Sequence, residues 1–117
     1  MHGLPRSFDP TFFVGRQMEM VCFNENQVYL HFDHKISIVI EAALRHEYGS
    51  GCDQVDSMPV TTSRLMRLLG AEVRNAKATI DGTLTLQFDN GDRLTCFDTS
   101  RSFESYRIQR GTEMTIV

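Results

Sequence analysis

The sequence predicts a mainly β domain, built as a β-sandwich or a partly open barrel, and three observations support this class. Apolar and polar residues alternate at a period of two in several short segments. Gly, Asn and Asp residues suited to tight turns separate these segments. The segments also form two similar groups, at about 14–42 and 69–98, which predicts two three-stranded meanders related by a pseudo-twofold axis.

The clearest hairpin belongs to the second group, where strands at about 83–88 and 92–98 flank a turn. A two-residue turn would mix apolar and polar residues on both faces. A three-residue loop with Gly91 in the left-handed conformation instead places Leu86 opposite Leu94 and makes one face apolar throughout. Because a one-residue slip would invert that face, we predict the three-residue loop.

The same pattern occurs 56 residues earlier, at about 27–33 and 36–42, around a loop of Asp33, His34 and Lys35. A strand at about 16–23 precedes it, as a strand at about 71–79 precedes the second hairpin. The second group holds one extra residue, which we explain by a β-bulge near 73–75. The inward face of the first meander is predicted to consist of Met18, Met20, Cys22, Val28, Leu30, Phe32, Ile36, Ile38 and Ile40.

Two helices are expected. Asp9 followed by Pro10 is typical of a helix start, and this helix must be short. The one substantial helix is predicted at about 60–69, because apolar side chains recur there at helical spacing and Gly70 supplies a stop.

The remaining segments complete the domain. Residues 43–48 fit either a strand or a helical turn, and residues 49–57 are expected to form a polar loop. A last hairpin at about 104–117 turns near Arg110 and Gly111.

Composition favours one ordinary globular domain over residues 1–117, since 41% of the residues are hydrophobic and 23% are charged. The net charge of −3, with scattered Lys and Arg, argues against nucleic-acid binding. No apolar stretch has the length of a signal or a membrane span, and three cysteines make a poor disulfide framework. We therefore expect a cytoplasmic protein without a membrane partner.

Metal and catalytic chemistry have little support. His31, His34 and His46 lie near acidic residues, but no pair has the spacing of a helical metal motif. Asp81, Asp89 and Asp92 fit the needs of tight turns. Cys22 and Cys96 are expected to be buried thiols, and Cys52 has no evident base beside it. We predict no catalytic residue, no metal and no cofactor.

The outer face of the first meander carries the one unusual feature. The predicted register places Val21, Tyr29 and Val39 side by side there, with Glu19, His31 and Ser37 in the next row. The equivalent outer row of the second meander is Lys77, Thr85 and Thr95. One sheet thus has an apolar stripe where the other has a polar one, and something should cover that stripe.

Two kinds of cover are open. The cover can be intramolecular, from Phe12 and Phe13 or from the apolar side of the predicted helix at 60–69. Otherwise Val21, Tyr29, Val39 and His31 form a surface for a second subunit or another protein.

Short motifs along the chain resemble a family of small bacterial proteins, frequent in actinobacteria, that is described only as a domain of unknown function. The motifs are Val14-Gly15-Arg16, Leu68-Leu69-Gly70, Asp81-Gly82-Thr83-Leu84, Phe88-Asp89-Asn90-Gly91 and Phe103-Glu104-Ser105-Tyr106. The resemblance covers residues 13–117, although the loop at 33–35 lacks the family's usual glycine. It implies one domain and brings no activity, cofactor or catalytic residue.

The leading functional hypothesis is therefore a non-enzymatic cytosolic domain that binds a protein, as an accessory or immunity-like protein or as a homodimer. The alternative is a small-ligand module or minor enzyme with a pocket between the meanders, lined by Tyr48, His46 and Glu47.

Overall fold

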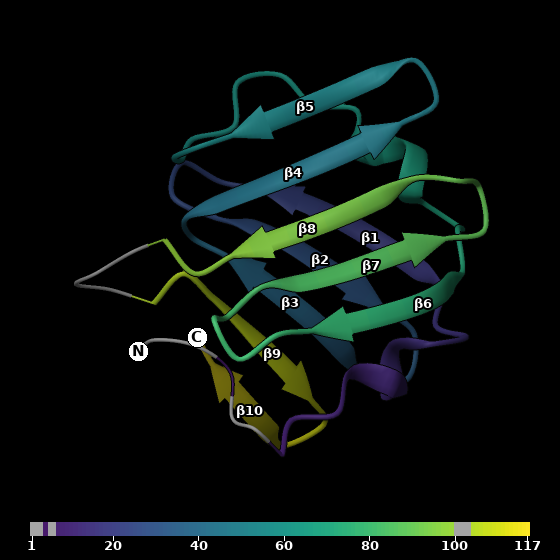
Figure 1. Cartoon of the computed structure of the whole chain (residues 1–117). Coiled ribbons are helices and arrows are strands. Elements are labelled where there is room, and N and C mark those ends of the chain that lie inside the picture. The colour runs from purple at the N-terminus through teal and green to yellow at the C-terminus, as the bar shows by residue number, and fades with distance from the viewer. Residues whose placement is uncertain (1–3, 5–6, 100–103) are drawn as a thin grey trace.

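The computed structural model describes residues 4, 7–99 and 104–117, and it consists almost entirely of antiparallel strands (Figure 1). The strands are β1 Met18–Phe23, β2 Val28–Phe32, β3 Ile36–Ile40, β4 Ala43–Tyr48, β5 Gly51–Val55, β6 Val73–Ala78, β7 Leu84–Phe88, β8 Arg93–Phe97, β9 Tyr106–Arg110 and β10 Glu113–Ile116. They form two five-stranded sheets, which confirms the mainly β sandwich. The first sheet has the order β1-β2-β3-β9-β10, and the second has the order β5-β4-β8-β7-β6.

Each sheet combines three consecutive strands with a hairpin from the other half of the chain. The β9–β10 hairpin joins the first sheet beside β3, and the β4–β5 hairpin joins the second sheet beside β8 (Figure 1). Residues 43–48 are therefore a strand, and the expectation of a polar loop over 49–57 is wrong because Gly51–Val55 pairs with β4. The description of the two halves as sequence repeats stays a prediction.

The predicted hairpin registers are confirmed. Leu84 pairs with Cys96 and Leu86 with Leu94, and Gly91 has a φ of 90°. In the first sheet Leu30 pairs with Ile38. These pairs decide which alternate residues of each strand face inward. The apolar faces of both meanders therefore meet between the sheets.

Replacing Gly91 with Ala is expected to lower the free energy of unfolding by about 1 kcal/mol, because an L side chain is strained at positive φ. Space is not the cause, since a Cβ at this position would meet nothing within 4 Å. Gly49→Ala is the matched control, because Gly49 has the same free space and no positive φ. Urea unfolding of both variants measures the difference, and equal losses would contradict the strain argument.

The predicted bulge near 73–75 is present, because the β6–β7 register shifts between Val73 and Asn75. An equivalent shift occurs in β1 between Met18 and Met20, so the bulge does not account for the extra residue of the second half. That residue lies instead in the turn after β6, where residues 79–83 take the place of residues 24–27.

The substantial helix predicted at 60–69 is wrong. The segment contains only a four-residue 3-10 turn, η2 Leu65–Leu68, which matches the first 3-10 turn, η1 Pro10–Phe13. Thr61, Thr62 and Val60 are β-branched residues with low helix propensity, so the first half of the predicted helix has little reason to form. The short helix expected after Asp9 is present as η1, and Asp9 accepts a hydrogen bond from the Thr11 amide at 3.0 Å.

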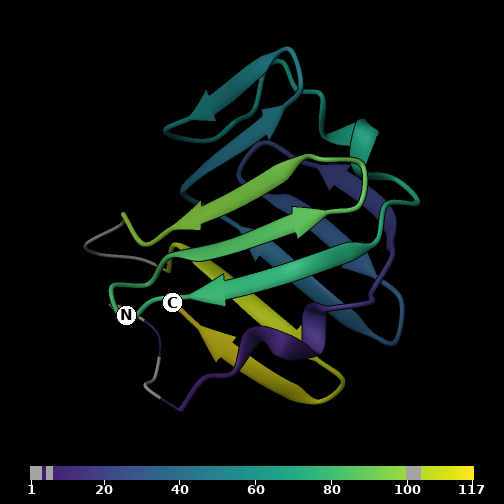
Figure 2. The same cartoon turned by 45° about the vertical axis from the view of Figure 1, so that its right-hand side comes forward.

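Figure 2 shows the two sheets stacked on each other, and the core lies between them. The turn η1 contributes Phe13 to this core, and η2 contributes Leu65 and Leu68. The segments that precede β1 and β6 pair with each other through Gln17 and Glu72, which ties the sheets together at one corner. The largest fully buried side chains are Tyr106, Phe13, Met18, Leu30, Ile38, Ile40, Leu44, Leu65, Leu68, Leu84, Leu86 and Leu94. None of the helical turns in the described residues has the length or hydropathy to cross a lipid bilayer.

Candidate functional site

The outer face of the first sheet differs from its predicted composition because of the bulge in β1. After Met18 the bulge reverses which residues of the strand point inward. Val21 therefore pairs with Leu30 and packs against the core, so its predicted place on the outer face is wrong. Cys22 faces outward beside Tyr29, and the expectation that Cys22 is a buried thiol on the inner face is also wrong.

Two rows of side chains cross this outer face from β1 to β10. The tyrosine row consists of Cys22, Tyr29, Val39, Arg107 and Ile116. The methionine row consists of Met20, His31, Ser37, Gln109 and Met114. Tyr29, Val39 and His31 thus occupy the predicted outer positions, while Cys22 replaces Val21 and Met20 replaces Glu19. The predicted place of Met20 on the inner face is therefore wrong.

The rows differ in how they are packed. At the two margins of the methionine row, Met20 and Met114 are each 51% exposed, although both are large apolar side chains. Within the tyrosine row Val39 is buried between longer neighbours. Tyr29 donates a hydrogen bond to Gln27 at 2.7 Å, and its ring stacks on His31 at 6.1 Å between centroids. These contacts hold the Tyr29 ring in place on the face.

Arg107 is the single cation of the two rows. Its guanidinium lies 3.2 Å from the carboxylate of Glu41 and 3.6 Å from that of Glu104. These ion pairs orient Arg107 beside Val39.

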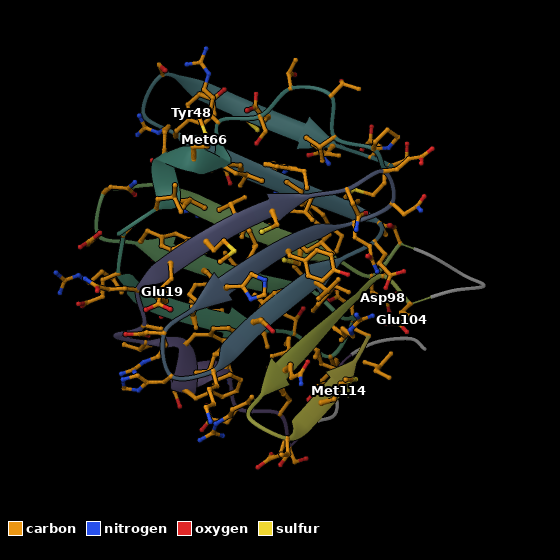
Figure 3. All side chains as sticks on the ribbon, turned by 180° about the vertical axis from the view of Figure 1, so that it is seen from behind. Glu19, Tyr48, Met66, Asp98, Glu104 and Met114 are labelled. Carbon is orange, nitrogen blue, oxygen red and sulfur yellow. The ribbon has the colours of Figure 1, made fainter. Side chains whose placement is uncertain are left out.

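The intramolecular cover considered for this face is not found in the described part of the chain. Phe13, Leu65 and Leu68 belong to the core between the sheets, and Phe12 packs against that core with Arg110 4.7 Å above its ring. Figure 3 looks directly onto the outer face, and no described helix or strand lies in front of β1, β2 and β3. Both margins of the apolar surface therefore stay open to solvent.

The same positions of the second sheet carry polar side chains, as predicted for Lys77, Thr85 and Thr95. The row equivalent to the tyrosine row is Lys77, Thr85, Thr95, Arg45 and Gln54. The row equivalent to the methionine row is Asn75, Gln87, Arg93, Glu47 and Cys52. Glu47 lies 3.7 Å from both Arg45 and Arg93, so this face is a network of solvated charges.

A second polar cluster lies between the sheets, at the end of β4. His46 and Tyr48 point inward, whereas Glu47 points outward, so the three residues of the alternative pocket do not share a face. His46 Nε2 lies 2.8 Å from Asp92 Oδ2, and both residues are almost completely buried. Arg67 donates to both oxygens of Asp92, at 3.0 and 3.1 Å.

Electrostatics in this cluster favour an ionised Asp92. Burial raises the pKa of Asp92, but hydrogen bonds from Arg67 and His46 outweigh burial, and the pKa lies below its usual range. Tyr48 donates to Asp53 at 2.9 Å, and this bond raises the pKa of Tyr48. The expectation that Asp92 serves the turn is wrong, because its carboxylate binds Arg67 and His46 instead.

The cluster has an apolar counterpart in the first sheet. His46 pairs with Leu94 as Ile108 pairs with Ile38. Asp92 lies opposite Phe88 as Ile36 lies opposite Phe32. One half of the sandwich therefore buries a histidine hydrogen-bonded to an aspartate where the other packs isoleucine. The signal in the sequence was Asp92 itself, a charged residue at an inward position.

The other candidates from the sequence remain apart. Asp81 accepts from the Thr83 amide at 3.1 Å and so serves its own turn, as expected. Asp89 accepts from the Glu72 amide at 3.1 Å, so its carboxylate holds the segment before β6, and the expectation that it serves its own turn is wrong. Cys52 is exposed, and burial raises the pKa of the Cys96 thiol to about 12. No three or more His, Cys, Asp or Glu residues of the described ranges are grouped to hold a metal ion.

The fold and this exposed face define a two-sheet antiparallel β-sandwich domain with one apolar and one charged outer surface. The chain belongs to a family of unknown function, DUF6188, whose model matches residues 10–117. No curated protein and no solved structure gives a significant match.

Proposed function

We propose that this protein is a non-enzymatic cytosolic domain that binds another protein chain through the outer face of its first sheet. The observation that carries the proposal is the contrast between the two outer faces. Six of the ten positions in the two rows of the first sheet carry an apolar or tyrosine side chain, whereas nine of the ten equivalent positions of the second sheet are polar or charged. Local strand geometry is the same in both, so the apolar residues are not explained by the needs of the sandwich.

The residue types support a protein partner. Tyr, Met and Arg are enriched at the centres of protein interfaces, and Tyr29, Met20 and Arg107 lie together on this face. Half-exposed methionines at both margins adapt to a partner's surface. The bacterial source expected from the resemblance, and the accessory or immunity-like role inferred from the outer stripe, belong to the same proposal.

The non-enzymatic part of the proposal rests on the polar cluster. His46 and Asp92 have almost no solvent exposure. The Asp92 carboxylate bonds to His46 and to Arg67. A buried histidine whose Nε2 is committed to a carboxylate has a structural use that needs no substrate.

Met20→Asp is expected to abolish binding, because it places a charge in the apolar margin of the face. Asn75→Asp is the matched control, since Asn75 occupies the equivalent outer position of the second sheet. Binding is measured in two ways, by light scattering of the purified protein over a range of concentrations and by pull-down from an extract of the source cells.

The expected result is complex formation by wild type and Asn75→Asp and its loss in Met20→Asp, with all three proteins equally folded by circular dichroism. Two results would sink the proposal: no complex in either measurement, or a complex that both substitutions leave intact.

A further inference from the structure

We infer that the partner is a second copy of this chain, bound face to face through the outer face of the first sheet about a twofold axis parallel to β3. The inference rests on the proposed function and names the partner of the same surface. The observation behind it is that the tyrosine row and the methionine row are each self-complementary about the central strand.

The strand order of the first sheet is symmetric in number about β3. β3 is the middle strand of the first sheet, with β2 and β1 on one side and β9 and β10 on the other. A twofold axis in the interface, parallel to β3, places β1 of one copy over β10 of the other. It also places β2 over β9, and β3 over itself.

The tyrosine row gains a specific contact in this arrangement. Tyr29 on β2 faces the partner's Arg107, and Arg107 faces the partner's Tyr29. A guanidinium over a tyrosine ring is a favourable cation–π pair, and the symmetry makes two of them. Cys22 meets the partner's Ile116, and Val39 lies on the axis beneath its longer neighbours, so no polar group of the row is set against an apolar one.

The methionine row matches in the same way. Met20 on β1 faces the partner's Met114, which would remove both half-exposed margins from water. His31 faces the partner's Gln109, and Ser37 lies on the axis. No position of either row sets a charge against a like charge.

The size of the face fits a modest dimer. Five strands spaced about 4.8 Å apart, each about five residues long, make a surface of about 24 by 17 Å. Two such faces bury on the order of 1,000 Å², the lower end of specific interfaces. We therefore expect a dissociation constant in roughly the micromolar range.

The second sheet limits the assembly to two copies. Its outer face carries Arg45, Glu47, Arg93 and Lys77, which form a solvated surface with no apolar row. Because each chain has one apolar outer face and that face binds itself, the contact closes at a dimer and does not propagate. A membrane surface fits less well, because Arg107 and Gln109 lie on β9, inside the face and not on one of its edge strands.

The test exchanges the two cation–π partners. Tyr29→Arg sets a second guanidinium against the partner's Arg107 at two symmetry-related places, and we expect the dissociation constant to rise at least tenfold. The double variant Tyr29→Arg, Arg107→Tyr restores a cation over a ring at both places, so the dimer should return to within a few-fold of wild type. Thr85→Arg places the same charge at the equivalent position of the second sheet and should leave the dimer unchanged.

Sedimentation or light scattering from about 1 µM to 1 mM measures the dimer fraction, and thermal unfolding followed by circular dichroism verifies that each variant is folded. A wild-type monomer at every concentration overturns the inference. A dimer that Tyr29→Arg leaves intact, or a folded double variant that stays monomeric, overturns the proposed pairing. A monomer that binds another protein from the extract, with loss in Met20→Asp, overturns the second copy as partner but leaves the proposed function standing.

Discussion

Fragments 1–56 and 57–117 are each expected to be unfolded in isolation and to fold together when mixed in equal amounts. The reason is the exchange of hairpins between the two halves. Strand β9 of the second fragment pairs with β3 of the first, and β4 of the first fragment pairs with β8 of the second. Alone, each fragment has strands of both sheets and completes neither.

The core shows how much depends on the exchange. Ile38 of the first half pairs with Ile108 of the second, and Leu44 pairs with Cys96, and all four are buried. Separation would expose these residues, and an isolated three-stranded meander with one open apolar face has little stability in water. We therefore expect the mixture to recover the spectrum of the intact chain at a one-to-one ratio.

Far-UV circular dichroism and a fragment titration measure this recovery. The control is the second fragment carrying Ile108→Asp, which should fail to fold with the first because the charge would face Ile38 in the core. Cooperative unfolding of either fragment alone, as a monomer, would refute the expectation.

Asp92→Asn is expected to lower the free energy of unfolding at pH 7 by about 3 kcal/mol, because it removes the charge of a buried carboxylate that pairs with the half-exposed Arg67 and bonds to the buried His46. The carboxylate receives three hydrogen bonds, one from His46 and two from Arg67. A neutral amide accepts at one atom only, so it leaves at least one of these donors without its acceptor. Urea unfolding measures the loss, and the control is Asp56→Asn, an exposed carboxylate that should change stability by less than about 0.5 kcal/mol.

The loss should also depend on pH in a defined direction. The pKa of Asp92 is lowered in the folded state, so its contribution is complete above the unfolded-state pKa and disappears as pH falls through the folded-state pKa. The gap in stability between wild type and Asp92→Asn should therefore be full near pH 6 and shrink below about pH 4. A gap that widens on acidification would show that the charge of Asp92 is not the source of the stability.

Strand register was predictable from local sequence because the period of two leaves few alternatives. Leu86 and Leu94 can share an apolar face in one register only, and Gly91 supplies the residue that the three-residue loop needs. Leu30 lies opposite Ile38 for the same reason, because this register alone gives the first hairpin an apolar face. Both loops are short, so the chain itself restricts the register.

Other features depend on contacts that local patterns do not contain. The bulge after Met18 turns Val21 inward and Cys22 outward. The sequence of β1 does not reveal this, because its residues alternate acceptably with either set facing the core. Strand β5 has only two apolar residues, Cys52 and Val55, and it pairs with β4 at the sheet edge. The alternation of apolar and polar residues in a hairpin also does not tell which sheet the hairpin joins. The exchange of the β4–β5 and β9–β10 hairpins between the two halves was therefore not predictable from a single sequence.

The candidate surface was predictable in part. Tyr29, Val39 and His31 lie on the outer face as expected, because they belong to hairpins whose register was clear. Arg107, Ile116 and Met114 were missed, since their place beside β3 follows from the exchanged hairpin. The cluster of His46, Arg67 and Asp92 joins three distant segments, and only the inward parity of Asp92 pointed to it.

The hairpin exchange also bears on how the chain folds during its synthesis. A ribosome makes residues 18–40 early, but the first sheet gains its last two strands only after residues 106–116 have emerged. Until then one edge of β3 has no neighbouring strand. The nascent chain therefore exposes unpaired backbone N–H and C=O groups beside the apolar face that later becomes the core. We therefore expect the incomplete chain to aggregate more readily than the finished domain.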